Sequence, residues 1–320
     1  MHKASRRAKG KALTMRRSRR DVLKASVAAA ALAAGGAADG AEEPPRGAPA
    51  GAGRAAAAQA LVVNHDLHTH TLWSDGAHPI PLHLLEARAF ELEALAITDH
   101  YTPGSKIAAS EEDFGRYLAE IDKERTGQND LRVIKGVEAC ALDATGRISI
   151  DERHAARVEW ILCDLGGLSE GTLRATPPEK SKYIDNVLSA YMGLCDVPYL
   201  NVIAHPFNTG NTTPAALPED YPERRLRELA AKMADKGKVF DVMNDMIYWF
   251  WKSGLAPRAF TAQYVELVKI FASEKVRFQI GSDDHRTGVG NTRWSQIVVN
   301  RAGVPPAQIV DATKIRRIDG

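Results

Sequence analysis

The amino-acid sequence predicts an α/β protein built on parallel strands, arranged as a barrel or an open sheet. Short apolar segments alternate along the chain with longer segments whose apolar residues recur every three or four positions. This alternation is typical of parallel folds, because each helix returns the chain to the start of the next strand. In addition, a histidine or a carboxylate follows nearly every predicted strand.

About seven strands and five helices are predicted from these segments. The strands lie at residues 61–68, 94–98, 131–138, 158–162, 199–204, 238–242 and 276–280. The helices lie at residues 81–93, 111–124, 180–194, 222–236 and 260–273. No internal repeat interrupts this order, so we expect residues 61–320 to form a single domain.

Charge is unevenly distributed along the chain. Residues 1–60 carry 12 Lys or Arg against 4 Asp or Glu, whereas residues 61–320 carry 30 against 36. We expect no nucleic-acid binding from the acidic body, because neutralising phosphates needs clustered positive charge. With 44% hydrophobic and 26% charged residues, the composition excludes disordered, fibrous and polytopic membrane proteins.

Residues 1–40 have the layout of an export signal. A basic segment ends at Lys24 and is followed by a short apolar run, Ala25 to Ala34. The pair Arg19–Arg20 resembles the twin-arginine (Tat) pattern; a basic tail beside an Ala-rich helix is the alternative. The apolar run is shorter than the ~20 residues of a membrane span. We therefore expect recognition by the Tat machinery, a periplasmic or secreted location and no stable membrane anchor.

Residues 41–60 are rich in Ala, Gly and Pro and predict a disordered linker, so the folded domain is expected to begin near Leu61. Cys140, Cys163 and Cys195 show no CxxC spacing and are expected to be buried apolar residues.

Candidate metal ligands gather where the predicted strands end. They are His68, His70, Asp75, His100, Glu138, His205, Asp283 and His285. Residues i and i+2 of a strand face the same side, so His68 converges with His70. In a parallel barrel all strands end on one face, which carries the chemistry. Burying so many ionisable groups together is unfavourable unless cations compensate them, and the pattern therefore predicts a polynuclear metal site.

The segments DLHTHTLWSDG, AITDH, GVE, IAHP and GSDDH follow one another between Asp66 and His285. In this order they resemble the polymerase and histidinol phosphatase (PHP) superfamily. The resemblance implies a distorted (β/α)7 barrel, similar to a TIM barrel, with two or three divalent ions (Zn, Mn or Fe) at the carboxyl ends of the strands.

The resemblance also implies which residues hold each ion. The first ion would be held by His68, His70, Glu138 and Asp283. Glu138 would bridge to a second ion that His205 also binds. Asp75, His100 and His285 would hold the third.

One departure concerns the second ion. The family often carries a further histidine after a strand similar to residues 158–162, where this chain continues Cys163-Asp164. Asp164, Cys163 or His154 is an alternative ligand, or the second ion is weakly bound or absent.

Clustered divalent ions supply hydroxide near neutral pH and offset the negative charge that grows on phosphorus. The chain is therefore expected to be a metal-dependent phosphoesterase that hydrolyses a small-molecule phosphate ester by attack of a metal-bound hydroxide. No GxSxG motif indicates a serine nucleophile. The alternatives are cleavage of a carbamate, ester or amide bond, and a noncatalytic metal-binding module. The near-complete ligand set argues against the last.

Other polar residues near the predicted ligands have open roles. Arg286 either holds an anionic substrate or forms a surface salt bridge, and Arg293 is a weaker candidate of the same kind. Asp99 either orients His100 or acts as a general acid or base. Asp284 is expected to be structural, and His65, His78 and His83 are expected to be ordinary surface or packing residues.

Four adjacent aromatic residues, 248–251, follow the predicted strand at residues 238–242. They either cover the barrel rim or a dimer contact, or line a substrate pocket. If they line the pocket, the substrate carries a sizeable apolar group.

Overall fold

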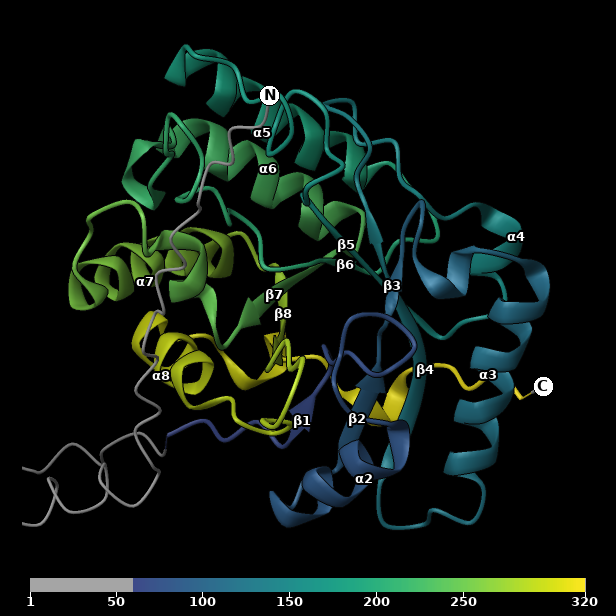
Figure 1. Cartoon of the computed structure of the whole chain (residues 1–320). Coiled ribbons are helices and arrows are strands. Elements are labelled where there is room, and N and C mark those ends of the chain that lie inside the picture. The colour runs from purple at the N-terminus through teal and green to yellow at the C-terminus, as the bar shows by residue number, and fades with distance from the viewer. Residues whose placement is uncertain (1–59, 320) are drawn as a thin grey trace, which may run out of the picture. The chain divides into compact units, whose positions relative to one another are not determined.

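Parallel strands form the centre of the structure, a computed structural model that describes residues 60–319 (Figure 1). The strands follow the order β1-β2-β4-β5-β6-β7-β8, and β3 pairs with β4. The predicted α/β class and barrel are thus confirmed. The predicted export signal and, except for Ala60, the predicted linker lie outside the described residues.

The strands are short, apart from β4. Their bounds are β1 (His65–Asp66), β2 (Ala94–Ile97), β3 (His100–Tyr101), β4 (Arg132–Cys140), β5 (Trp160–Asp164), β6 (Val202–Ile203), β7 (Val239–Met243) and β8 (Arg277–Gly281). The helices are α2 (Ile80–Ala89), α3 (Glu111–Arg125), α4 (Glu152–Ala155), α5 (Lys180–Cys195), α6 (Glu223–Asp235), α7 (Pro257–Ser273) and α8 (Arg293–Ala302). Five short 3₁₀ helices complete the regular secondary structure of the described residues, among them η3 (Met246–Phe250).

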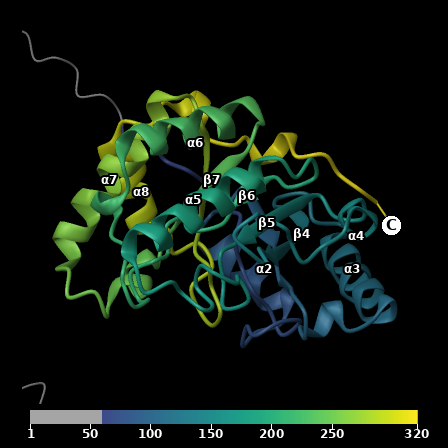
Figure 2. The same cartoon turned by 90° about the horizontal axis from the view of Figure 1, so that it is seen from above.

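The first and last strands meet and nearly close the barrel. The amide of Leu67 donates to the carbonyl of Ile280 at 3.2 Å, and the amide of Asp283 donates to the carbonyl of His68 at 2.9 Å. Helices α5, α6, α7 and α8 lie outside the strands on one side of the barrel, with α2 and α3 on another (Figure 2). The ends of β1 and β8 are therefore held side by side.

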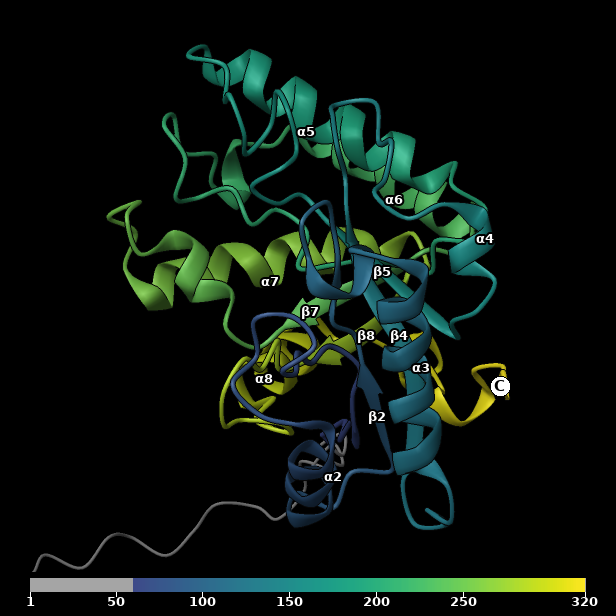
Figure 3. The ribbon, with the colours of Figure 1, turned by 45° about the vertical axis from the view of Figure 1, so that its right-hand side comes forward.

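Helix α3 shows how local sequence builds one wall. The Ser110 hydroxyl accepts the Asp113 amide at 3.0 Å and caps the helix start. Phe114, Tyr117 and Ile121 recur at helical spacing and are fully buried. The Tyr117 hydroxyl donates to the carbonyl of Gly136 at 2.8 Å, so α3 is attached to β4, which it accompanies in Figure 3.

The barrel interior is apolar away from the carboxyl ends of the strands. One buried cluster there contains Leu67, Ala94, Ala96, Ile134, Trp160, Leu162, Val202, Ala204, Val239, Val310 and Ala312. Val310 and Ala312 come from the last described segment, which Arg125 binds through the carbonyl of Ile318 at 2.6 Å. The candidate metal ligands, in contrast, lie at the carboxyl ends of the strands.

The structure differs from the predicted elements at several points. Helix α2 ends at Ala89 rather than at residue 93, because Glu91 is left-handed (φ 56°) and the Leu92 amide donates back to Ala87. Strand β3 and helices α4 and α8 were not predicted. Within residues 60–319 no helix combines the length and the apolar character that a membrane span requires.

Candidate metal centre

Glu138 is the centre of the candidate site. It is buried near the end of β4, and four histidines surround its carboxylate. The Glu138 oxygens lie 3.4 Å from Nε2 of His68, 3.4 Å from Nε2 of His70, 2.9 Å from Nδ1 of His100 and 3.2 Å from Nε2 of His205. These histidines come from β1, β3 and β6 or the turns after them, as the alignment of parallel strand ends predicts.

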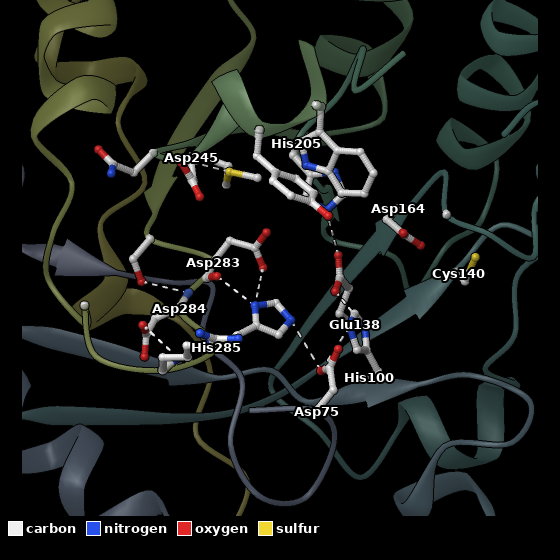
Figure 4. Close-up of a pocket in the computed structure, with 18 of the residues that line it drawn as sticks. Asp75, His100, Glu138, Cys140, Asp164, His205, Asp245, Asp283, Asp284 and His285 are labelled. Carbon is white, nitrogen blue, oxygen red and sulfur yellow. Dashed lines mark hydrogen bonds and ion pairs between the residues drawn. The ribbon is translucent and has the colours of Figure 1, made fainter. Parts of the chain in front are cut away.

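Asp283 and Asp75 extend the cluster on either side of His285. Asp283 Oδ1 lies 3.1 Å from His70 Nε2 and 3.4 Å from His68 Nε2. Asp75 Oδ1 lies 3.3 Å from His285 Nε2 and 3.5 Å from His100 Nε2 (Figure 4). Asp75 is 61% exposed whereas His68 and His70 are fully buried, so the cluster runs from the protein interior to the cavity mouth.

The spacing of these atoms fits ligands that share cations. Two atoms bonded at 2.0–2.2 Å to one ion in tetrahedral or octahedral geometry lie about 2.8 to 3.6 Å apart. In three groups, ligand atoms from each member lie within 4.8 Å of one another. The groups are His68, Glu138 and His205; His68, His70 and Asp283; and His70, Asp75, His100 and His285.

Buried polar atoms without hydrogen-bond partners point to the same conclusion. In the described part of the chain they include Nε2 of His68, both ring nitrogens of His70 and both carboxylate oxygens of Glu138. Buried polar atoms are normally paired, because an unpaired group loses its interactions with water. Several unpaired atoms of ligand type in one place therefore fit bound divalent ions.

The carboxylates of this cluster favour protonation of two neighbouring histidines, His100 and His285. Burial opposes the charge on His100, yet Glu138 raises its pKa to about 9. Burial likewise opposes the charge on His285, while Asp75 raises its pKa to about 9. Burial and the neighbouring His100 together lower the pKa of His70 to about 3. The carboxylates thus attract positive charge that divalent ions supply when they replace the protons.

Backbone strain coincides with two candidate ligands. His205 and Asp283 have positive φ angles of 26° and 55°. Such conformations cost about 1–3 kcal/mol and tend to occur at functional sites. Asp66 holds the Asp283 turn, because its carboxylate accepts the amides of Ser282 at 2.9 Å and Gly290 at 2.8 Å.

All eight predicted metal ligands thus lie in one cluster, although their role as ligands stays a prediction. The groups differ from the predicted sets, since His70 joins Asp75, His100 and His285. Of the alternatives for the second ion, Asp164 lines the cavity. Cys163 is packed in the apolar core, and His154 pairs with Asp151 and Glu111.

Asp99 lies behind the candidate ligands. Its predicted role, to orient His100 or to transfer protons, stays a prediction; it is fully buried and does not line the cavity. Its carboxylate accepts the Thr71 amide at 2.7 Å, the Thr71 hydroxyl at 2.8 Å and the Ser74 hydroxyl at 2.6 Å. Asp99 therefore shapes the turn that leads to Asp75, and its acceptor sites are used within the protein.

The other polar residues separate into cavity and packing positions. Arg286 is exposed and lines the cavity, whereas Arg293 does not line it. Asp284 accepts the amide of Arg286 at 3.1 Å and its other oxygen lies 3.6 Å from His83. His65 is buried, and His83 is buried against the carbonyl of His70 at 2.9 Å.

The aromatic run 248–251 divides between cavity and packing. Tyr248 and Trp249 line the cavity. Phe250 is fully buried and Trp251 is 65% exposed. Neither predicted role therefore describes the whole run.

Asp241 is a polar residue that sequence reasoning missed. It is fully buried in β7, and its Oδ2 lies 2.9 Å from His68 Nδ1. Gln279 donates to Asp241 Oδ1 at 3.0 Å, and Trp160 Nε1 donates to Gln279 at 2.8 Å. An ionised Asp241 holds the proton on Nδ1 of His68 and leaves Nε2 free to bind a cation. A charged residue within the apolar segment VFDVM was the available signal.

Comparison with known families and proteins yields consistent results. The family model described as "PHP domain" matches residues 66–244. A "Probable phosphatase" of Acetivibrio thermocellus is 31% identical over 144 residues, which is 45% of this chain and 54% of that protein. A "Probable phosphatase" of Caldicellulosiruptor bescii is 25% identical over 250 residues, 77% of this chain and 90% of that protein. The first match thus spans about half of the relative's length.

Among solved structures, the histidinol phosphate phosphatase of Lactococcus lactis has a similar fold. That crystal structure contains zinc, L-histidinol and phosphate. The TM-score is 0.56 with 16% sequence identity, and the match covers 79% of this chain and 99% of that chain.

Proposed function

The chain belongs to the PHP domain family. From this premise we propose that it is a metal-dependent hydrolase that cleaves a phosphate ester of a small molecule. The observation that carries the proposal is the set of unpaired, buried ligand atoms of His68, His70 and Glu138 beside a cavity of about 860 Å³. The names of the two bacterial relatives and of the solved structure support the same activity.

The residues of the chain have distinct parts in the proposed reaction. His68, His70, Glu138, Asp283 and His205 would hold the inner ions, and the residues nearer the mouth would hold an outer one; these are Asp75, His100 and His285. Two or three divalent ions of Zn, Mn or Fe held there would lower the pKa of coordinated water and would offset negative charge on the phosphate.

Arg286 is placed to bind the substrate phosphate. It follows His285 directly, lines the cavity and has no ion pair among residues 60–319. A guanidinium can donate two parallel hydrogen bonds to phosphate oxygens. Arg286 would therefore orient the ester against the ligand cluster.

An activity assay tests this function. After loading with Zn²⁺ or Mn²⁺, the purified chain is expected to hydrolyse p-nitrophenyl phosphate or bis-p-nitrophenyl phosphate. EDTA should abolish this activity and added metal should restore it, because the ions would activate the attacking water. Turnover of 1-naphthyl methylcarbamate alone would reject the phosphoesterase proposal in favour of the carbamate alternative. No turnover of any of the three would favour a noncatalytic metal-binding module.

We also propose that the chain is exported by the twin-arginine pathway. The support is the basic segment with Arg19–Arg20 ahead of the apolar run from Ala25. Replacing both arginines by lysine retains the charge but removes the motif. Fractionation of expressing bacteria is expected to find the unaltered chain in the periplasm and the variant in the cytoplasm. Equal export of both would contradict the proposal.

A further inference from the structure

An unpaired carboxylate lies beside two aromatic rings in the outer part of the cavity. Asp245 is exposed, lines the cavity and precedes η3 as its N-cap residue. Its side chain accepts no capping hydrogen bond. In the described part of the chain no Lys or Arg pairs with it either. The Asp245 carboxylate is therefore available to interact with a ligand bound in the cavity.

The geometry of η3 places Tyr248 on the same face as Asp245. Side chains at positions i and i+3 of a 3₁₀ helix lie over one another. The Tyr248 amide donates to the carbonyl of Asp245 at 2.8 Å, which establishes this register. Tyr248 also lines the cavity and is 58% exposed, so its ring is available for contact.

Trp249 adds a second ring face at nearly a right angle. The Tyr248 and Trp249 ring centroids lie 5.4 Å apart with an interplanar angle of 82°. Trp249 also stacks on the candidate ligand His205 at 5.6 Å and 28°. Asp245 and His205 lie on the same side of the cavity in Figure 4, near Asp283. Together Asp245, Tyr248 and Trp249 form a corner, here called the aromatic corner, next to the ligand cluster.

Contacts with Gly210 and Asn211 hold the aromatic corner in place. Phe250 is buried and packs directly against Gly210. A Cβ atom at position 210 would overlap with the Phe250 ring. Asn211 Nδ2 donates to the carbonyl of Tyr248 at 2.7 Å, and Asn211 Oδ1 accepts the amide of Lys252 at 3.1 Å. These contacts anchor the carboxyl-terminal half of η3, so a ligand at the corner meets preorganised aromatic rings.

We propose that the aromatic corner binds a quaternary ammonium group in the alcohol part of the substrate, which makes the substrate a phosphate ester of a quaternary ammonium alcohol. This inference rests on the proposed function. Aromatic ring faces attract ammonium cations, and methyl groups on nitrogen fit against the rings. A neutral aryl group would desolvate Asp245 without compensation. A primary ammonium has three N–H donors, for which the corner provides one carboxylate.

A pair of esters of nearly equal shape tests the inference. Choline phosphate and 3,3-dimethylbutyl phosphate differ in the charged nitrogen, which is a carbon atom in the second ester. For the metal-loaded full chain, we expect kcat/KM to be about tenfold higher for choline phosphate. Asp245→Asn and Tyr248→Leu should bring this ratio close to one, whereas Tyr248→Phe should retain most of it.

The matched control is Asp235→Asn, which makes the same chemical change at an exposed position at the end of α6. It should keep the ratio of the unaltered chain. A ratio of one or below in the unaltered chain overturns the inference, and so does a preference for ethanolamine phosphate over choline phosphate. In both cases hydrolysis of 3,3-dimethylbutyl phosphate still supports the phosphoesterase function. If neither this ester, p-nitrophenyl phosphate nor bis-p-nitrophenyl phosphate is hydrolysed, the proposed function fails and the inference fails with it.

Discussion

Replacing Glu138 by glutamine is expected to abolish turnover while the fold is retained. Glu138 contacts four candidate histidine ligands, and both of its oxygens are buried without hydrogen-bond partners. An amide of the same shape lacks the charge that attracts divalent ions and turns an NH₂ group towards them. Loss of metal catalysis removes several kcal/mol of transition-state stabilisation, which corresponds to a fall in kcat/KM of about a thousandfold or more.

Three measurements on this variant distinguish metal loss from misfolding. Metal content after dialysis should fall together with kcat/KM on p-nitrophenyl phosphate, whereas the circular dichroism spectrum should remain that of the unaltered chain. Glu228→Gln is the matched control, because Glu228 lies exposed on α6 and pairs only with Arg224 among the described residues. Full activity of Glu138→Gln with a normal metal content would reject the central role of Glu138.

The second large effect is expected from Asp241→Asn, a change at a residue outside the ligand set. Asp241 holds the proton on Nδ1 of His68, so its charge strengthens Nε2 as a donor to a cation. Loss of such a partner typically weakens metal binding 10- to 100-fold. Competition against a chromophoric chelator should show this decrease, and excess metal should restore much of the activity.

Rescue by metal separates this positioning role from a purely structural one. A variant that is merely destabilised would melt at a lower temperature but would bind metal with unchanged affinity. Asp235→Asn serves again as the matched control and should leave the affinity unchanged. Unaltered metal affinity in Asp241→Asn would contradict the proposed role of Asp241.

The fold could be predicted because apolar periodicity reflects burial. The segments at 94–98, 111–124 and 180–194 match β2, α3 and α5 within about one residue. The end of α2 was wrong because a non-glycine residue, Glu91, adopts the left-handed conformation that stops the helix. Strand β3 is only two residues long. It pairs with the carboxyl-terminal part of β4, and apolar periodicity does not encode such a tertiary contact.

The ligand cluster was predictable for a different reason. Parallel strands end on one face, so residues such as His70, Glu138 and His285 could be placed together without coordinates. The direction of a side chain within a turn could not be predicted in this way. Asp99 is adjacent to His100 in sequence but faces Thr71 and Ser74. Asp241 could be recognised as a partner of His68 only after β8 had been placed between β7 and β1.

The central claim is that side chains distant in sequence share a small cluster of divalent cations. Anomalous diffraction from crystals of the Zn- or Mn-loaded chain tests it most directly. The account predicts at least two anomalous peaks within about 2.0–2.3 Å of ligand atoms, with Glu138 contacting one of them and His285 or Asp75 another. Fully loaded crystals whose peaks all lie away from His68, Glu138 and Asp283 would contradict it.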